Sequence, residues 1–170
     1  MKSLRFIILF TSICPIALSA QTQKIGHINS NALLAKMPEV GKADTLIAMY
    51  QKELSTKGEE MAKAFKTKAA AYQTEYQAGK LAPLEAEKQK NVLIKEQQDL
   101  QAFGQDAEQK VGILRKQLFQ PVINKVNDAI KAVAKEGGLD YVIDSGSGTL
   151  FYSDESKDVT AAVKKKLGMN

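Results

Sequence analysis

Few residues in this 170-residue chain could carry out covalent or metal chemistry. There is one histidine, His27, in a predicted strand, and one cysteine, near the N-terminus. Asp140 and Asp144 lie four apart and share one face of another predicted strand, but no acid/base partner accompanies them. Residues 145–148, Ser-Gly-Ser-Gly, lack the directly following helix that a phosphate-binding loop needs. We therefore predict that the protein is not an enzyme and uses no cofactor and no metal.

The N-terminus has the layout of a secretory signal peptide. Lys2 and Arg5 precede an apolar run over residues 6–13, and small residues lead to a cleavage point after Ala20 or one residue earlier. The apolar run is too short to remain as a spanning helix, which needs about 20 apolar residues. We expect residues 1–20 to be removed on export, which leaves a mature chain without cysteine.

The charge balance limits the class of partner. The chain has 24 basic and 19 acidic residues, and removal of Lys2 and Arg5 leaves 22 against 19, a net charge of +3. This mild excess fits acidic binding partners and peripheral contact with anionic lipid. No base-reading motif is present, so we expect no nucleic-acid partner.

Two long helices are predicted in the middle of the chain. The first runs from Glu39 to Ala78, begins after Met37-Pro38 and is capped by Gly79. Lysine, glutamate, glutamine and alanine dominate it, and all four are good helix formers. One face carries apolar residues at steps of three and four, with one double step. They are Leu46, Tyr50, Leu54, Met61, Phe65, Ala69, Tyr72 and Tyr76.

The second helix is expected from Pro83 to Glu136, before Gly137-Gly138. Its predicted seam consists of Val92, Glu96, Leu100, Phe103, Ala107, Val111, Leu114, Leu118, Val122, Val126, Ile130 and Val133. Between residues 92 and 122 the steps repeat as four, four and three, and this eleven-residue period predicts nearly straight helices. At about 1.5 Å per residue, the two helices would measure roughly 60 and 80 Å. We interpret residues 39–120 as an antiparallel hairpin, the arm, with a bend at Pro121 where a helix hydrogen bond is lost.

The chain ends supply a small β-rich body, residues 21–38 and 121–170. Strands are predicted at 24–29, 139–144 and 150–153, with the last two joined as a hairpin. Asp158 is expected to cap a final helix over residues 159–167. Three short strands sit near the lower limit of independent stability, and their open edges favour aggregation. We therefore expect several copies of the chain to share one sheet, through Ile25, Ile28, Tyr141, Ile143, Leu150 and Tyr152.

The two ends resemble a known family. The opening KIGHINSNALLAKMPEV and the closing FQPVINKVNDAIKAVAKEGGLDYVIDSGSGTLFYSDESKDVTAAVKKKLG are similar to those of the Skp/OmpH periplasmic chaperones. The resemblance implies a mainly α protein with a small β body: a jellyfish-like homotrimer with a shared β-barrel and three helical arms around a cavity. It also implies a periplasmic holdase that binds unfolded outer-membrane β-barrel proteins without ATP and prevents their aggregation.

A holdase needs many weak, sequence-tolerant contacts, and the arm carries apolar side chains among its lysines. Methionine repacks easily, and lysine covers apolar surface with its stem. The expected client contacts are Met49, Tyr50, Met61, Phe65, Tyr72, Tyr76, Leu81, Leu84 and Phe103. For each of them the alternative is packing within the arm. The alternative for the whole protein is a structural coiled-coil envelope protein that binds no client, but the thin eleven-residue seam disfavours it.

Overall fold

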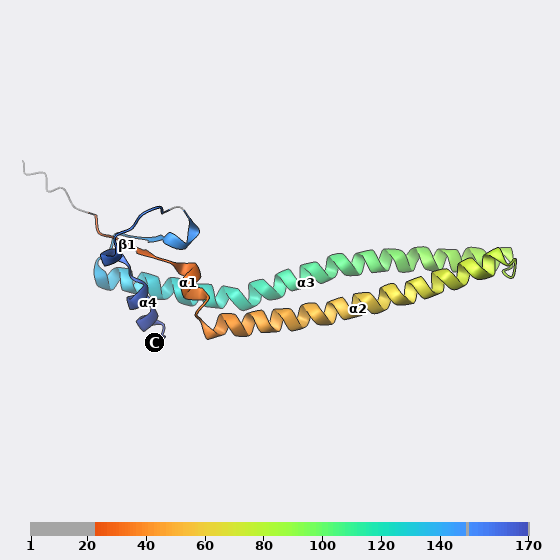
Figure 1. The fold of residues 1–170 in the computed structure, drawn as a ribbon, viewed down its shortest axis with the longest axis horizontal. Helices are drawn as coiled ribbons and strands as arrows, with labels where there is room; N and C mark the ends of the chain where they lie inside the picture. The colour runs from red at the N-terminus through yellow and green to blue at the C-terminus, as the bar shows by residue number, and fades with distance from the viewer. Residues whose placement is uncertain (1–22, 149, 170) are drawn as a thin grey trace, which may run out of the picture.

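The computed structural model describes residues 23–148 and 150–169 and is mostly helical. The signal peptide and its cleavage after Ala20 lie outside the described residues. The elements are β1 (Ile25–Ile28), α1 (Ser30–Leu34), α2 (Pro38–Gln77), α3 (Pro83–Gly137), β2 (Tyr141–Asp144) and α4 (Thr160–Lys166), with short 3-10 turns at Ser145–Ser147 and Glu155–Lys157. Figure 1 shows a small body at one end, from which α2 and α3 extend side by side.

The two long helices begin and end within one residue of the predicted bounds. Each starts with a proline, Pro38 or Pro83, at a position where the missing N–H has no helical partner to lose. Gly79 (φ 65°) follows α2, and Gly138 (φ 59°) caps α3, both in the left-handed region that favours glycine. Since a short turn joins them, α2 and α3 run antiparallel; we call them the helix pair.

The contact between α2 and α3 repeats every eleven residues. On α2 the seam positions, all buried or half-buried, are Ala43, Ile47, Tyr50, Leu54, Gly58, Met61, Phe65, Ala69 and Tyr72. On α3 the equivalent positions over the central stretch are Glu96, Leu100, Phe103, Ala107, Val111, Leu114, Leu118 and Val122. This spacing keeps the contact on one side of each helix without a left-handed supercoil.

The seam differs from the predicted one at both ends. Leu46 is 50% exposed, and its neighbour Ile47 is buried at 2%. Val92 is 52% exposed, and Leu93 takes the half-buried place. In both cases two adjacent apolar residues compete for one seam position, and periodicity alone does not decide which of them turns inward.

The hydrophobic core lies in the body, where both chain ends meet the last turns of α3. Its buried members are Ile28, Leu33, Met37, Val122, Val126, Ala129, Val133 and Val163. Val159 and Leu167 pack beside Val163 at the core. Asp158 Oδ1 accepts a hydrogen bond from Thr160 N, the first residue of α4, at 2.7 Å. The body therefore joins residues from the two ends of the sequence.

The predicted hairpin of strands 139–144 and 150–153 is wrong for the described chain. β2 pairs in parallel with β1, with Ile25 opposite Tyr141 and Ile28 opposite Asp144. A 3-10 turn follows β2 directly, and Leu150–Ser153 form no strand. The Asp144 side chain accepts a hydrogen bond from Gly146 N at 2.8 Å, which favours this tight turn over a hairpin loop.

Asp144 also ties the end of β2 to the start of α1. Its carboxylate accepts hydrogen bonds from Ser30 N at 3.1 Å and from Ser30 Oγ at 2.5 Å. Burial acts to raise the pKa of Asp144, but the bonds from Ser30 and Gly146 outweigh it and lower the pKa below its usual value. The ionised carboxylate therefore stabilises the body.

We expect Asp144→Ala to lower the free energy of unfolding by about 1–3 kcal/mol, because it leaves two half-buried donors of Ser30 and one of Gly146 without this acceptor. Since the folded pKa is depressed, the contribution is complete above about pH 4 and is lost as the pH falls through the folded pKa. Urea unfolding at fixed chain concentration measures both effects. Asp128→Ala, on the exposed side of α3, is the control; equal losses for both variants would contradict the role of Asp144.

Candidate functional site

The histidine and the two aspartates considered as candidate catalytic groups make hydrogen bonds within the body. His27 is 9% exposed, and its Nε2 lies 3.0 Å from the Asp154 carbonyl oxygen. Asp140 accepts a hydrogen bond from Lys24 N at 2.8 Å, and Asp144 holds the body together as described. Among residues 23–148 and 150–169, no three metal-binding side chains gather into a group. The exposed apolar side chains form another candidate surface.

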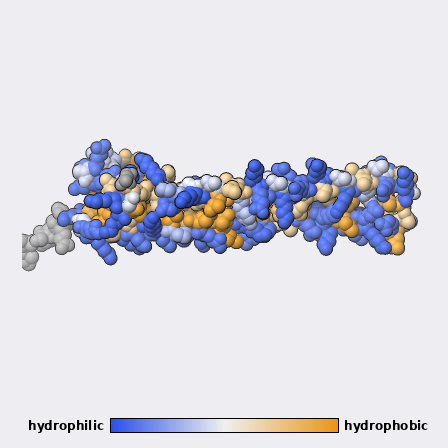
Figure 2. Space-filling view, turned by 90° about the horizontal axis from the view of Figure 1, so that it is seen from below, coloured by the Kyte–Doolittle hydropathy of each residue, from blue (hydrophilic) through white to orange (hydrophobic). Residues whose placement is uncertain are grey.

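Large apolar side chains are exposed in two regions, the body and the helix pair. Figure 2 shows apolar surface over the half of the helix pair nearer the body and again near its far end, between stretches of hydrophilic surface. The most exposed on the helix pair are Leu46, Met49, Tyr76, Leu84, Val92, Ile94 and Ile113. Leu46, Met49 and Ile113 line grooves near the body, and Val92 lines a hollow near the far end; a further hollow lies between them.

The first surface, the basal patch, consists of Leu46, Met49, Tyr50, Ile113 and Leu114. Two adjoining open grooves of about 920 and 430 Å³ share Leu46 and Tyr50. Met49 is 65% exposed, and Leu46 and Ile113 are about half exposed. Lys52, Lys57 and Lys110 line the same grooves together with Glu53 and Glu60, so the apolar surface is surrounded by charges of both signs.

The second surface is a hollow of about 490 Å³ midway along the helix pair. Leu54, Leu100, Phe103, Ala107 and Val111 form most of its apolar lining. It exists because two glycines, one on each helix (residues 58 and 104), place no side chain there. The Lys57 Nζ lies 5.6 Å from the centre of the Phe103 ring.

The third surface is a hollow of about 360 Å³ near the far end of the helix pair. Tyr72, Val92 and Leu93 supply its apolar lining, and Lys68, Glu75, Glu85 and Lys88 surround them. The Tyr72 and Tyr76 rings stack with centroids 5.7 Å apart. The helix pair thus presents apolar side chains among charged ones both near the body and near its far end.

The predicted client-contact residues divide into two groups. Met49, Tyr76 and Leu84 are more than half exposed. Half-buried side chains make up the other group: Tyr50, Met61, Phe65, Tyr72, Leu81 and Phe103. Leu46 and Ile113 were missed as surface residues. Leu46 was placed in the seam, and Ile113 follows no apolar stripe of its own helix.

The body exposes a further apolar surface. A hollow of about 590 Å³ is lined by Ile25, Leu139, Ile143, Leu150 and Tyr152 together with polar neighbours. Tyr141 is 55% exposed, Tyr152 84% and Phe151 99%. Ile28, expected to contact another copy, is instead 2% exposed and belongs to the core of its own chain. Phe151 was not singled out in the sequence, although it lies beside Tyr152.

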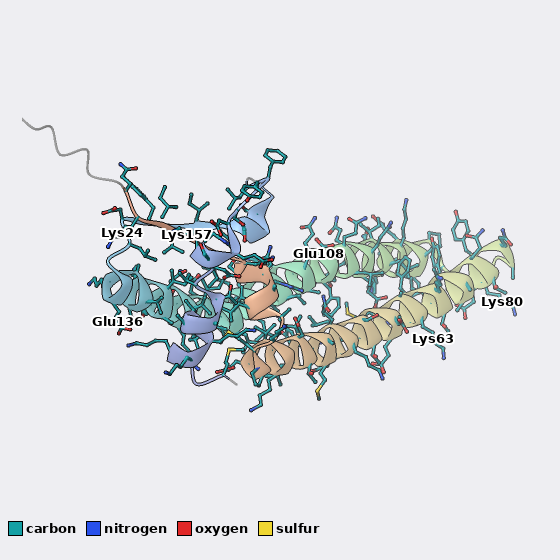
Figure 3. All side chains as sticks on the ribbon, turned by 60° about the vertical axis from the view of Figure 1, so that its left-hand side comes forward. Lys24, Lys63, Lys80, Glu108, Glu136 and Lys157 are labelled. Carbon is teal, nitrogen blue, oxygen red and sulfur yellow. The ribbon has the colours of Figure 1, made fainter. Side chains whose placement is uncertain are left out.

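Charged side chains project from both helices, such as Lys63 of α2 and Glu108 of α3, and from the turn that joins them, such as Lys80 (Figure 3). Hydrogen bonding to Asp106, at 2.7 Å, raises the pKa of Lys110. A hydrogen bond from Lys125 lowers the pKa of Glu39 at the base of the helix pair. Acidic and basic groups alternate over the surface, so the apolar patches are surrounded by charges of both signs.

Among the residues that the structure describes, none of the helices has an apolar stretch long enough to span a lipid bilayer.

Comparison with known proteins gives consistent results. The model of the family described as outer membrane protein (OmpH-like) matches residues 24–167. The chaperone protein Skp of Yersinia enterocolitica is 27% identical over 152 residues, which are 88% of each chain. Skp of Yersinia pseudotuberculosis is 44% identical over 45 residues, 26% of each chain. The crystal structure of an OmpH-like outer membrane chaperone from Caulobacter crescentus has a TM-score of 0.70 at 18% identity, with 86% of this chain and 84% of that chain covered, and thus shares the fold.

The glycines of α3 provide a test of the central hollow. A Cβ added at Gly104 or at Gly112 would meet no atom within 4 Å. Gly104→Ala and Gly112→Ala should each raise the free energy of unfolding by about 0.5–1 kcal/mol, because alanine is the better helix former. Thermal melts followed by circular dichroism measure this. Destabilisation by Gly104→Ala alone would mean that the hollow is more tightly filled than the structure shows, since Gly112 lies outside it.

Proposed function

Because the chain belongs to the family of OmpH-like outer membrane proteins, we propose that it is a periplasmic holdase for unfolded outer-membrane β-barrel proteins. It would bind them without ATP and keep them from aggregating. Proteins of this chaperone family are not enzymes, in agreement with the prediction. Periplasmic location requires export, for which the sequence of residues 1–20 provides the predicted signal.

The observation that carries this proposal is the helix pair with its exposed apolar side chains. Between Ile47 and Val122, Ala86 is the only buried side chain. A structural coiled coil would bury its seam more fully. Here Leu46, Met49 and Ile113 remain available to a partner. Unfolded barrel strands alternate apolar and polar residues. A surface on which apolar side chains lie among lysines and glutamates can contact the apolar and the polar residues of such a strand.

The arm of the proposed chaperone is residues 39–120, and the body is residues 21–38 and 121–170. Pro121 would be the joint: it follows Leu118, the last half-buried seam residue before it, and directly precedes Val122, the first core residue of α3. Helix α3 continues through Pro121, which has no N–H to donate to the helix.

Self-association is the second part of the proposal, with a homotrimer as the expected state. The two-stranded sheet leaves Ile25, Tyr141 and Ile143 exposed on its outer face. Leu150–Ser153, which form no strand here, would pair with a strand of a neighbouring copy and cover the hollow beside His27. Such pairing would remove open sheet edges, which otherwise promote aggregation. Several arms could then hold one client, and their combined avidity would exceed that of any single contact.

We expect the protein at micromolar concentration to be an oligomer by native mass spectrometry. Ile143→Asp combined with Tyr152→Asp should give single chains, because two charges would be buried at the contact. The circular dichroism of the long helices should persist. Ile113→Asp, which adds charge at a similarly exposed site on the helix pair, should leave the oligomer intact. A monomeric parent protein, or an intact oligomer after both body changes, would contradict the shared sheet.

Client binding is tested by diluting an urea-unfolded outer-membrane barrel protein into buffer and following light scattering. We expect suppression of scattering at stoichiometric oligomer without nucleotide. The triple change Leu46→Ser, Met49→Ser and Ile113→Ser should raise the concentration for half suppression about fivefold or more, a loss of ~1 kcal/mol or more. Ile123→Ser, outside the basal patch, is the control. Unchanged scattering with excess parent protein would show that the holdase proposal is wrong.

A further inference from the structure

The seam of the helix pair contains one acidic residue, Glu96. Eleven and twenty-two residues further along α3, the same seam position is occupied by Ala107 and Leu118. The Glu96 side chain is 28% exposed and forms an ion pair with Lys68 of α2, whose side chain is 57% exposed. On α2, the seam residue beside Lys68 is the small Ala69. At this level, therefore, the two helices are joined by charge and not by apolar packing.

This ion pair separates two parts of the helix pair that are packed differently. On the side nearer the body, the seam contains the large side chains of Phe65, Leu100 and Phe103. On the far side, residues 69–95 form the tip segment, where Tyr72, Ala86 and Leu93 are buried or half-buried between the helices. Tyr72 and Leu93 also line the hollow of about 360 Å³. The tip segment has little apolar contact to hold its helices together.

Only two ion pairs link α2 to α3 within these fully described helices. Lys125 and Glu39 form the other, at the base, where the Nζ–Oε1 distance is 2.7 Å. The tip therefore depends on Lys68–Glu96, the turn over residues 78–82 and a few apolar contacts. A half-exposed ion pair adds little net stability, and water and salt compete with it. An apolar residue at position 96 would instead seal the seam.

We infer that the Lys68–Glu96 ion pair is a releasable clasp, which lets the helices of the tip segment separate while the rest of the helix pair stays closed. Separation need not break the hydrogen bonds within either helix, so its cost falls on the clasp, on the turn over residues 78–82 and on the side chains that face the partner helix. It exposes Tyr72, Ala86 and Leu93, which are otherwise turned toward the partner helix. Local openings of this kind occur where few apolar contacts are buried.

The use of the clasp rests on the proposed function, although its existence does not. An open tip segment would offer an unfolded client additional apolar surface, next to the exposed Tyr76, Leu84 and Val92. A closed tip would hide that surface when no client is bound. The clasp would thus set how much of the far end of the arm is available for capture.

Thiol labelling can measure the opening, since the chain from residue 21 onward has no native cysteine. Ala86, 8% exposed in the tip segment, and Ala43, 4% exposed near the body, are both changed singly to cysteine. In the folded protein, the cysteine at position 86 should react with a small thiol reagent at least tenfold faster than that at position 43. Equal rates would overturn the inference that the tip opens separately.

The clasp itself is tested in the Ala86→Cys background. Glu96→Leu should slow labelling about tenfold, a shift of ~1.4 kcal/mol in the opening equilibrium. Raising salt from about 0.05 to 0.5 M should speed labelling with Glu96 present but not with leucine there. Glu87→Leu adds the same apolar side chain at an exposed position of the tip and serves as the matched control. If Glu96→Leu slows labelling no more than Glu87→Leu, the inference that the Lys68–Glu96 ion pair controls the opening of the tip segment is wrong.

The same variants separate the clasp from the holdase. Glu96→Leu should raise the concentration needed to suppress client scattering, and Glu87→Leu should not. If Glu96→Leu slows labelling yet suppresses scattering as well as the parent protein, the link between opening and capture is wrong. If the parent protein fails to suppress scattering, the proposed function is wrong, and the labelling rates alone still decide whether the clasp exists.

Discussion

The parallel pairing of β1 with β2 is the contact on which the rest of the structure depends. It joins residues more than a hundred positions apart, and backbone and side-chain bonds between Lys24 and Asp140 extend it. Parallel strands need a long crossover connection, and here that connection contains α1, α2 and α3. Because the last turns of α3 pack through Val122, Val126 and Val133 into the same core, the pairing also fixes the base of the helix pair.

Beyond that base, the helix pair has no hydrophobic core to stabilise it. Two helices side by side bury little, and Ala86 is the single buried residue between Ile47 and Val122. Local helix formers, proline starts and glycine ends therefore carry much of the stability of α2 and α3. Polar and small residues in the seam, such as Glu96 and Gly58, reduce the packing further. A surface that is not sealed inside the pair is free to contact other chains.

The sequence was sufficient for features that depend on local physics and insufficient for those set by distant contacts. Pro38, Gly79, Pro83 and Gly138 are local signals, so the bounds of the long helices were predicted within one residue. The choice of Ile47 over Leu46 depends on the phase of α2 against α3, which periodicity leaves open. The predicted hairpin failed because β2 pairs with a strand from the other end of the chain. In the basal patch, Met49 and Tyr50 were predicted contacts, but Leu46 and Ile113 were missed because the patch combines side chains from two helices.

The two apolar regions demand different kinds of partner, and this difference links the fold to the proposed function. On the body, Ile25, Tyr141 and Ile143 lie on a two-stranded sheet whose edges offer a regular hydrogen-bonding pattern, which suits an identical copy. On the helix pair, Met49 and its neighbours stand on helices that already satisfy their own backbone hydrogen bonds. Such a surface offers only side-chain contacts, which are weak singly and tolerant of sequence. Assembly through the body would thus bring several arms together around one client. Capture without ATP would then need only the avidity of many weak contacts and the reversible opening of the tip segment.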